Sequence, residues 1–514
     1  MTRAPFRRFA SPLAFAPVLA GGLLASAASA QFVEPAQQVL YTLRGAPGEF
    51  LGYYGNPIAD VDGDGKRDLL LGAPFSDAAI TNGGRVYLHS GATGALISTY
   101  TGTIGNEFMG QSVDDAGDLN GDGVHDIIAG AAGQPFNSSP GVRGRVLTFS
   151  GAPPFGLIWQ VPGVNPSDRF GNNVSGLYSD LNGDGVPEVI ASATLHDATG
   201  TNAGRVYILS GADGAVVRTM DGLANANNHG TAVCSIGDLD GDGKRDVVVA
   251  ARNDGLPTRG GRAYIYSSAT GLTIRPTLIP APSAVDFGFF FMNSAGDFDG
   301  DGTDDVYIND FSDNSLGATT GKAYVFSGAS GAEIAQFTGS MAGVGFGIGR
   351  MVTDADGDGR ADLFVANWIG SAGATQAGQG LLFSSSSRAV LQTMTCNIPN
   401  TQAGFDGFGL NDVNNDGRND YVLTGQGDSP ATITRGDGVV YVLAGRVGPT
   451  FYGDMNCDGF ITVGDIGGFV LALTDPVEYA VQNPACIMLA ADTNRDGFVT
   501  VGDISGFVTL LTGP

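Results

Sequence analysis

The sequence predicts a mainly β fold, a seven-bladed β-propeller, followed by a small all-α domain, and three observations lead to this prediction. A nine-residue pattern, D-x-[DN]-x-D-G-x-x-[DE], occurs seven times, with successive copies 58, 62, 58, 59, 57 and 58 residues apart. Each unit carries four short β-rich runs separated by Gly-rich turns, which is the strand number of a propeller blade. After residue 445 this period ends, and two loop-and-helix units follow.

The repeating unit keeps one order of elements. In the first copy a Phe-Leu-Gly element (50–52) precedes the loop, an apolar run (69–74) follows it, and strands near 84–91 and 96–100 complete the unit. The seventh unit stops after residue 443 and lacks its fourth strand. Because segment 39–44 resembles the missing strand, we expect it to complete the seventh blade and close the ring; an open solenoid would need capping repeats.

Charge and the N-terminal segment narrow the class of protein. The chain holds 52 acidic and 26 basic residues, and its net charge of -26 argues against nucleic acid or an anionic membrane as a partner. Arg3, Arg7 and Arg8, an apolar stretch at 13–24 and the sequence Ala-Ser-Ala at 28–30 predict a secretory signal. No later segment is apolar enough to span a membrane, so we expect a secreted or cell-surface bacterial protein. The expected domains are the signal peptide (1–30), the propeller (31–445), a linker (446–453) and a C-terminal module (454–514).

The seven loops have the chemistry of calcium sites. Positions 1, 3, 5 and 9 carry carboxylates or Asn, position 6 is Gly in every copy, and position 7 offers its backbone carbonyl. This oxygen set suits Ca²⁺, so we expect about seven ions in the propeller; the alternative is that Asp and Gly only form tight turns. The third loop departs most, because it has Glu at position 9. The expected ligands are Asp60, Asp62, Asp64, Lys66 and Asp68; Asp118, Asn120, Asp122, Val124 and Asp126; Asp180, Asn182, Asp184, Val186 and Glu188; Asp238, Asp240, Asp242, Lys244 and Asp246; Asp297, Asp299, Asp301, Thr303 and Asp305; Asp354, Asp356, Asp358, Arg360 and Asp362; and Asp412, Asn414, Asp416, Arg418 and Asp420.

The C-terminal module contains two loops of a different kind. Both fit a twelve-residue EF-hand register with Asp or Asn at positions 1, 3 and 5, Gly at 6, Thr at 9 and Asp at 12, and an amphipathic helical pattern follows each. Two more Ca²⁺ are therefore expected. The cysteines Cys457 and Cys486 both lie in this module, and a disulfide between them is plausible. The expected ligands are Asp454, Asn456, Asp458, Phe460, Thr462 and Asp465, and Asp492, Asn494, Asp496, Phe498, Thr500 and Asp503.

These motifs resemble two known families. The Phe-Leu-Gly at 50–52 and the Gly-Ala-Pro at 72–74 resemble the FG-GAP repeat of integrin α-chains and related bacterial secreted proteins, over residues 39–445. The paired loop-helix units resemble a dockerin, which implies a cohesin-like partner. The two positions before each final Asp, where dockerins usually contact their partner, are Val-Gly in both units, so a calcium-folded sorting or anchoring tag is the alternative. The FG-GAP resemblance implies adhesion or carbohydrate attachment outside the cell.

The sequence favours a binding protein over an enzyme. It has four His, none with metal-ligand or triad spacing, and none of the common hydrolase or nucleotide-binding motifs. The loops between the second and third strands of each unit are long and differ between copies, which is typical of recognition surfaces. A protein or polysaccharide ligand is expected there, with Trp368, Phe136, Phe311 and Arg252 as candidate contacts. The alternatives are a polysaccharide-degrading enzyme, or its accessory subunit, and a structural envelope or matrix component.

Overall fold

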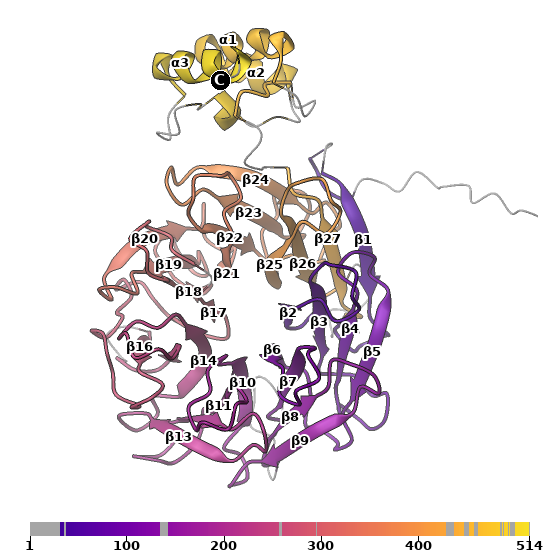
Figure 1. Cartoon of the computed structure of the whole chain (residues 1–514), viewed down its shortest axis with the longest axis vertical. Coiled ribbons are helices and arrows are strands. Elements are labelled where there is room, and N and C mark those ends of the chain that lie inside the picture. Colours follow the sequence, from indigo (N-terminus) through magenta and orange to yellow (C-terminus); the bar gives the residue numbers. More distant parts are fainter. Residues whose placement is uncertain are drawn as a thin grey trace, which may run out of the picture.

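The protein is described by a computed structural model, in which seven sheets stand around a central axis with a helical tail beside the ring (Figure 1). The predicted seven-bladed propeller with a small helical domain is confirmed. The described residues are 31–34, 37–133, 142–255, 260–294, 296–427, 436–446, 452–456, 461–483, 486, 488–491, 493 and 499–512. The predicted signal segment 1–30 lies outside them.

Each blade is an antiparallel meander whose first strand lies nearest the axis. The first three blades are β2 (Gly55–Ile58), β3 (Asp68–Ala73), β4 (Arg85–His89) and β5 (Leu96–Thr101); β6 (Ser112–Gly117), β7 (Asp126–Ala131), β8 (Arg145–Phe149) and β9 (Leu157–Pro162); and β10 (Phe170–Gly176), β11 (Val189–Ala193), β12 (Arg205–Leu209) and β13 (Val216–Asp221). The next three are β14 (His229–Ile236), β15 (Asp246–Ala251) and β16 (Arg262–Tyr266); β17 (Met292–Asn293), β18 (Val306–Asp310), β19 (Lys322–Phe326) and β20 (Glu333–Thr338); and β21 (Phe346–Val352), β22 (Asp362–Asn367), β23 (Gln379–Phe383) and β24 (Val390–Thr395). The last blade is β25 (Asp406–Asn411), β26 (Asp420–Gly425), β27 (Val439–Leu443) and β1 (Val39–Arg44).

The core lies between neighbouring sheets. The second strands, such as β7 and β22, are buried along their whole length, because adjacent blades cover both of their faces; this explains their continuous apolar sequence. The outermost strands, such as β5 and β20, are instead exposed or half-buried at every position but one. The difference in pattern therefore reflects the distance of a strand from the rim of the ring.

The ring is closed by the first strand of the chain. β1 pairs antiparallel with β27, so the last blade contains strands from both ends of the propeller sequence. Across the junction with the first blade, the Tyr41 hydroxyl donates a 2.5 Å hydrogen bond to the Gly91 carbonyl. The outer strands of the first and second blades make the same kind of contact, from Tyr100 to the Ser150 carbonyl (2.8 Å) and from the Trp159 indole to the Gly211 carbonyl (2.6 Å).

The tail is a compact helical unit. It contains η1 (Val463–Asp465), α1 (Ile466–Thr474), α2 (Pro476–Gln482), η2 (Met488–Ala491), η3 (Val501–Asp503) and α3 (Ile504–Thr512). Phe469 of α1 and Phe507 of α3 stack in its core, with ring centroids 3.9 Å apart. Cys486 is disulfide-bonded, and its predicted partner Cys457 lies outside the described residues. Among the described residues, no helix has the length and apolar character needed to cross a membrane.

Candidate functional site

The seven acidic loops connect the first and second strands of the blades. In the first blade the loop runs from β2 to β3, and its last residue, Asp68, is the first residue of β3. Gly65, at position 6, has a φ of 85°, and the Gly at this position in the other loops is also left-handed. Because other residues rarely adopt this conformation, Gly at position 6 is what allows the chain to turn back on the carboxylates.

The carboxylates of each loop are oriented by backbone N–H groups. The position-1 carboxylate accepts a hydrogen bond from the position-6 N–H in all seven loops, at 2.7–3.1 Å. In the four loops with Asp at position 3, one oxygen each from positions 1, 3 and 9 lies within 4.8 Å of the others. These sets are Asp60, Asp62 and Asp68; Asp238, Asp240 and Asp246; Asp297, Asp299 and Asp305; and Asp354, Asp356 and Asp362. Three converging carboxylates can hold a divalent cation.

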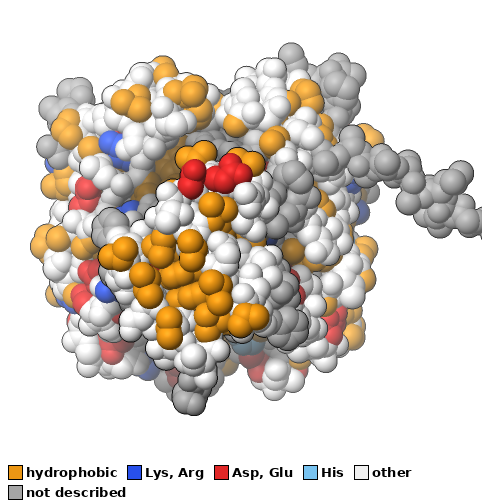
Figure 2. All heavy atoms as spheres, turned by 90° about the horizontal axis from the view of Figure 1, so that it is seen from above, with side chains coloured by type: hydrophobic (Ala, Val, Ile, Leu, Met, Phe, Trp, Pro, Cys, Tyr) orange, Lys and Arg blue, Asp and Glu red, His pale blue; other side chains and the backbone are white. Residues whose placement is uncertain are grey.

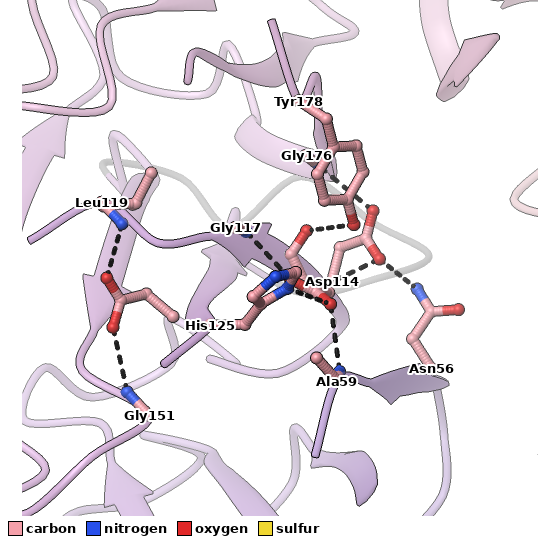
Figure 3. Close-up of polar contacts among 11 residues, drawn as sticks. Asn56, Ala59, Asp114, Gly117, Leu119, His125, Gly151, Gly176 and Tyr178 are labelled. Carbon is pink, nitrogen blue, oxygen red and sulfur yellow. Dashed lines mark hydrogen bonds and ion pairs between the residues drawn. The ribbon is translucent and has the colours of Figure 1, made fainter. Parts of the chain in front are cut away.

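The position-9 carboxylate also joins two turns of its blade. It is fully buried in all seven loops, and it accepts the position-2 N–H at 2.7–2.9 Å. In six blades its second oxygen accepts an N–H from the turn that follows the third strand, at 2.9–3.3 Å. In the second blade the Asp126 carboxylate accepts the N–H groups of Leu119 and Gly151, the two donors labelled at the left of Figure 3. One carboxylate therefore takes part in a candidate cation site and holds two turns together.

The turn that follows the third strand carries a Gly in several units because it lies very close to the acidic loop. A Cβ on Gly91 would lie 1.8 Å from the Arg67 carbonyl oxygen, and one on Gly328 would lie 1.9 Å from the Asp304 carbonyl oxygen. No side chain fits at that separation. The Ser-Gly that follows the third strand in several units is therefore required by the close approach of this turn to the acidic loop.

Burial raises the pKa of the position-9 carboxyl in every loop, because an ionised group is poorly solvated there. The pKa rises from 3.8 to about 6 in Asp68, Asp126, Asp246, Asp305 and Asp420. The pKa values of Asp362 and Glu188 also rise, chiefly by burial and secondarily, for Asp362, by the charge of Asp356. A cation beside these groups would favour the ionised form.

The predicted ligands at positions 5 and 7 lie outside the clusters formed by positions 1, 3 and 9. The position-5 carboxylates accept the position-7 N–H of their own loops, at 2.8–2.9 Å. In the third loop, Glu188 accepts the N–H groups of Leu181 and Asn182 (2.7 and 3.1 Å). Ligation by the position-7 carbonyls stays a prediction.

The tail loops are described only in part. Asp465 is buried and accepts N–H groups from Met455, Asn456 and Thr462 at 2.7–3.1 Å. Asp503 is also buried and accepts the Thr500 N–H at 2.8 Å. The Thr462 and Thr500 hydroxyls accept N–H groups at the starts of η1 and η3, so both act as helix caps. The predicted ligands Asp458, Phe460, Asp492, Asn494, Asp496 and Phe498 lie outside the described residues.

A second candidate site is an aromatic pocket of about 180 Å³ near the axis. Apart from Ile348 in β21, its lining residues lie just before the first strands of their blades or just after the second strands, so the pocket is at the end of the channel opposite the acidic loops. Trp368 meets Phe311 and Phe405 edge to face, with ring centroids 6.3 and 5.7 Å apart. The Trp368 indole N–H is buried and has no hydrogen-bond partner in the described part of the chain. Tyr53 and Phe290 also line the pocket.

The structure brings two of the four predicted contacts, Trp368 and Phe311, into this pocket. Arg252 lies beside it: its guanidinium stacks on Phe289 at 4.0 Å and forms an ion pair with Asp286 at 2.6 Å. Phe136 lies outside the described residues. Sequence reasoning missed Phe290 and its neighbours, although the run Phe-Gly-Phe-Phe-Phe-Met at 287–292 departs visibly from the other repeats.

Comparison with known proteins agrees with this geometry. Residues 53–89 match the FG-GAP repeat, and residues 180–249 and 238–308 match the FG-GAP-like repeat. The propeller carries FG-GAP repeats. Human integrin alpha-IIb is 34% identical over 175 residues, 30% of this chain and 16% of the integrin. Chicken integrin alpha-8 is 27% identical over 298 residues, 55% of this chain and 25% of the integrin. The chain thus spans a quarter or less of the length of these relatives.

The raised carboxyl pKa values predict how stability depends on pH without a bound cation. Unfolded carboxyls lose their protons near pH 4, whereas the folded position-9 groups keep them to about pH 6. Unfolding between these values therefore releases protons, and the free energy of unfolding should fall as pH rises from 4 to 7. His229, whose pKa burial lowers to about 4, and His89, whose pKa burial also lowers, oppose this trend, but the buried position-9 carboxyls outnumber them. Thermal melts of cation-free protein at pH 4.5 to 7.5 test it; a melting temperature that rises with pH contradicts it.

Proposed function

We propose that the protein is an exported, calcium-loaded binding protein that attaches to polysaccharide outside the cell. The observation that carries this proposal is the pairing of a rigid ring, built on buried carboxylates, with an aromatic pocket at the opposite end of its channel. The integrin relatives and the predicted signal segment support an extracellular site of action. Bacterial origin and the domain boundaries given above are part of the proposal.

Calcium is the cation that best suits the loops. Their donors are carboxylate and amide oxygens, and the clusters at positions 1, 3 and 9 place those oxygens close together. Hard oxygen donors in a flexible loop favour Ca²⁺ over Zn²⁺ or Cu²⁺. Seven ions in the propeller and two in the tail would offset most of the net charge of -26. The position-9 carboxylate would then be ionised while remaining buried.

Substitutions in one loop test this assignment. Asp68→Asn should remove about one Ca²⁺ of about nine and lower the melting temperature in calcium, because position 9 binds the cation and both turns. Asp62→Asn should keep the ion with weaker affinity, since three other loops already have Asn at position 3. Isothermal titration calorimetry of the chelator-treated chain measures the number of bound ions and their affinity in each variant. Two or fewer bound ions in the unsubstituted protein would contradict the assignment.

The aromatic pocket is the proposed ligand site. Sugar rings present flat apolar faces that pack on aromatic side chains, and the unpartnered Trp368 N–H can donate to a hydroxyl. This chemistry favours polysaccharide over a protein ligand. Among the described lining residues, the polar groups are the tyrosine hydroxyls, the Trp368 N–H and the Gln426 amide, and these do not form an acid and base pair suited to bond cleavage.

Removal of the Trp368 ring tests the pocket. Trp368→Ala should reduce binding to glycan arrays and cell-wall fractions at least tenfold, because the ring supplies much of the contact area. Leu316→Ala is a matched control, since Leu316 is 60% exposed on the loop between β18 and β19 and lies outside the pocket lining. The polysaccharide proposal is wrong if the two variants bind equally well. It is also wrong if the chain binds only the protein components of the cell-wall fractions.

The tail is proposed to dock the protein onto an envelope or cohesin-like partner. Its two units expose matching apolar side chains: Val463 and Val501 are 81% and 79% exposed, and Val470 and Val508 are 51% and 50% exposed. Figure 2 shows hydrophobic side chains gathered on the face seen from above, where the tail lies. An exposed apolar patch of this kind marks an interaction surface.

Charge introduced on this patch should release the protein from its partner. Val470→Lys with Val508→Lys should abolish retention on envelope preparations, because a buried Lys is poorly tolerated at an apolar interface. Thr474→Lys with Thr512→Lys adds the same charge at the exposed ends of the same helices and should leave retention intact. Equal retention of both double variants would exclude the apolar patch as the docking surface.

A further inference from the structure

The central channel has a second cavity, at the end next to the acidic loops. It measures about 230 Å³ and is lined by the last residues of the first strands and by residues of the loops that follow. Asn56 of β2, Met292 of β17 and Val352 of β21 come from three different blades. The cavity is therefore a shared feature of the ring, at the opposite end from the aromatic pocket.

Charge in this cavity is opposite in sign to that of the whole chain. Three arginines, Arg67, Arg245 and Arg350, line it, against a single carboxylate, that of Asp114. Arg350 is neutralised by an ion pair with Asp406 at 3.0 Å. The Asp114 carboxylate accepts hydrogen bonds from the Asn56 amide (3.0 Å) and the Gly176 N–H (3.1 Å), as Figure 3 shows. With Arg350 paired to Asp406, Arg67 and Arg245 face only the one carboxylate of Asp114, so the lining keeps a net positive charge.

Both of these arginines occupy position 8 of an acidic loop, in the first and fourth copies. Among the residues that the structure describes, neither guanidinium forms an ion pair, and the Arg245 Nε is buried without a hydrogen-bond partner. Buried donors are usually satisfied, and the acidic residues outnumber the basic ones by 52 to 26. An unpaired arginine donor in such a chain points to a ligand that supplies the acceptor.

The rest of the lining offers neutral polar groups. The amides of Asn293 and Asn411 and the hydroxyl of Thr353 lie in the same cavity. Arginine binds planar carboxylates through paired N–H groups, and amides and hydroxyls bind hydroxyl groups. A long polyanion is disfavoured, because the surrounding protein is strongly acidic. We propose that this end of the channel binds a small hydroxylated carboxylate, such as a sugar acid, with Arg67 and Arg245 on its carboxylate.

A titration of the mature protein with D-galacturonate and D-galactose, followed by ligand-observed NMR, tests the proposal. These sugars differ in a carboxylate, so galacturonate should bind and galactose should bind at least tenfold more weakly. Arg67→Gln with Arg245→Gln should lower the galacturonate affinity at least tenfold. The two single variants keep the test valid if the double variant misfolds. Each should lose part of the galacturonate affinity and keep the melting temperature of the unsubstituted protein.

Arg143→Gln is the matched control, because Arg143 is an exposed arginine two residues before β8 and lines neither cavity. It should bind galacturonate as the unsubstituted protein does. Trp368→Ala should also keep galacturonate binding, which separates this site from the proposed polysaccharide pocket. Equal binding of the two sugars, or galacturonate binding that survives the double substitution, would overturn the proposal.

Discussion

The buried carboxylate at the start of the second strand of the first blade, Asp68, and its six counterparts are the groups on which the propeller depends. Each lies out of contact with solvent and holds the acidic loop, and in six blades also the adjacent turn, through backbone N–H groups. A buried carboxylate without a counter-charge is unfavourable, and its raised pKa expresses this cost. The fold has therefore placed seven anionic groups where only a proton or a cation makes them stable. The proposed cation sites and the blade geometry thus share one side chain.

The two ends of the channel have contrasting chemistry. One end is closed by aromatic rings centred on Trp368 and Phe290, and the other is open, polar and locally basic around Arg67 and Arg245. Between them, Arg350 stacks over Tyr54 and Phe408 at 5.3 and 5.2 Å, and its charge is held by Asp406. This paired and stacked group lies between the aromatic and the polar ends. Ligands of different character can thus use one ring without competing for one surface.

The fold class could be predicted because its signal is repeated. Seven copies of one loop at nearly constant spacing fix the number of blades, and the alternation of short strands and turns fixes their content. The clusters of carboxylates were also visible in sequence, since they are local. The sequence predicts the aromatic pocket only in part: Trp368 and Phe311 lie in the variable loops where a ligand is expected, whereas Tyr53, Phe290 and Phe405 lie just before the first strands of their blades. The basic cavity was not foreseen at all, because Arg67 and Arg245 are 178 residues apart and only closure of the ring places them in one cavity.

The pairing of β1 with β27 has a consequence for the order of assembly. The two strands are separated by nearly 400 residues of sequence, so their contact forms last and carries a large loop-closure entropy. Until β27 has emerged from synthesis or export and met β1, the ring is a curved stack in which each of these two strands has an unpaired edge. A chaperone or a late-acting cation that protects those edges would govern the yield of finished protein more than its final stability does.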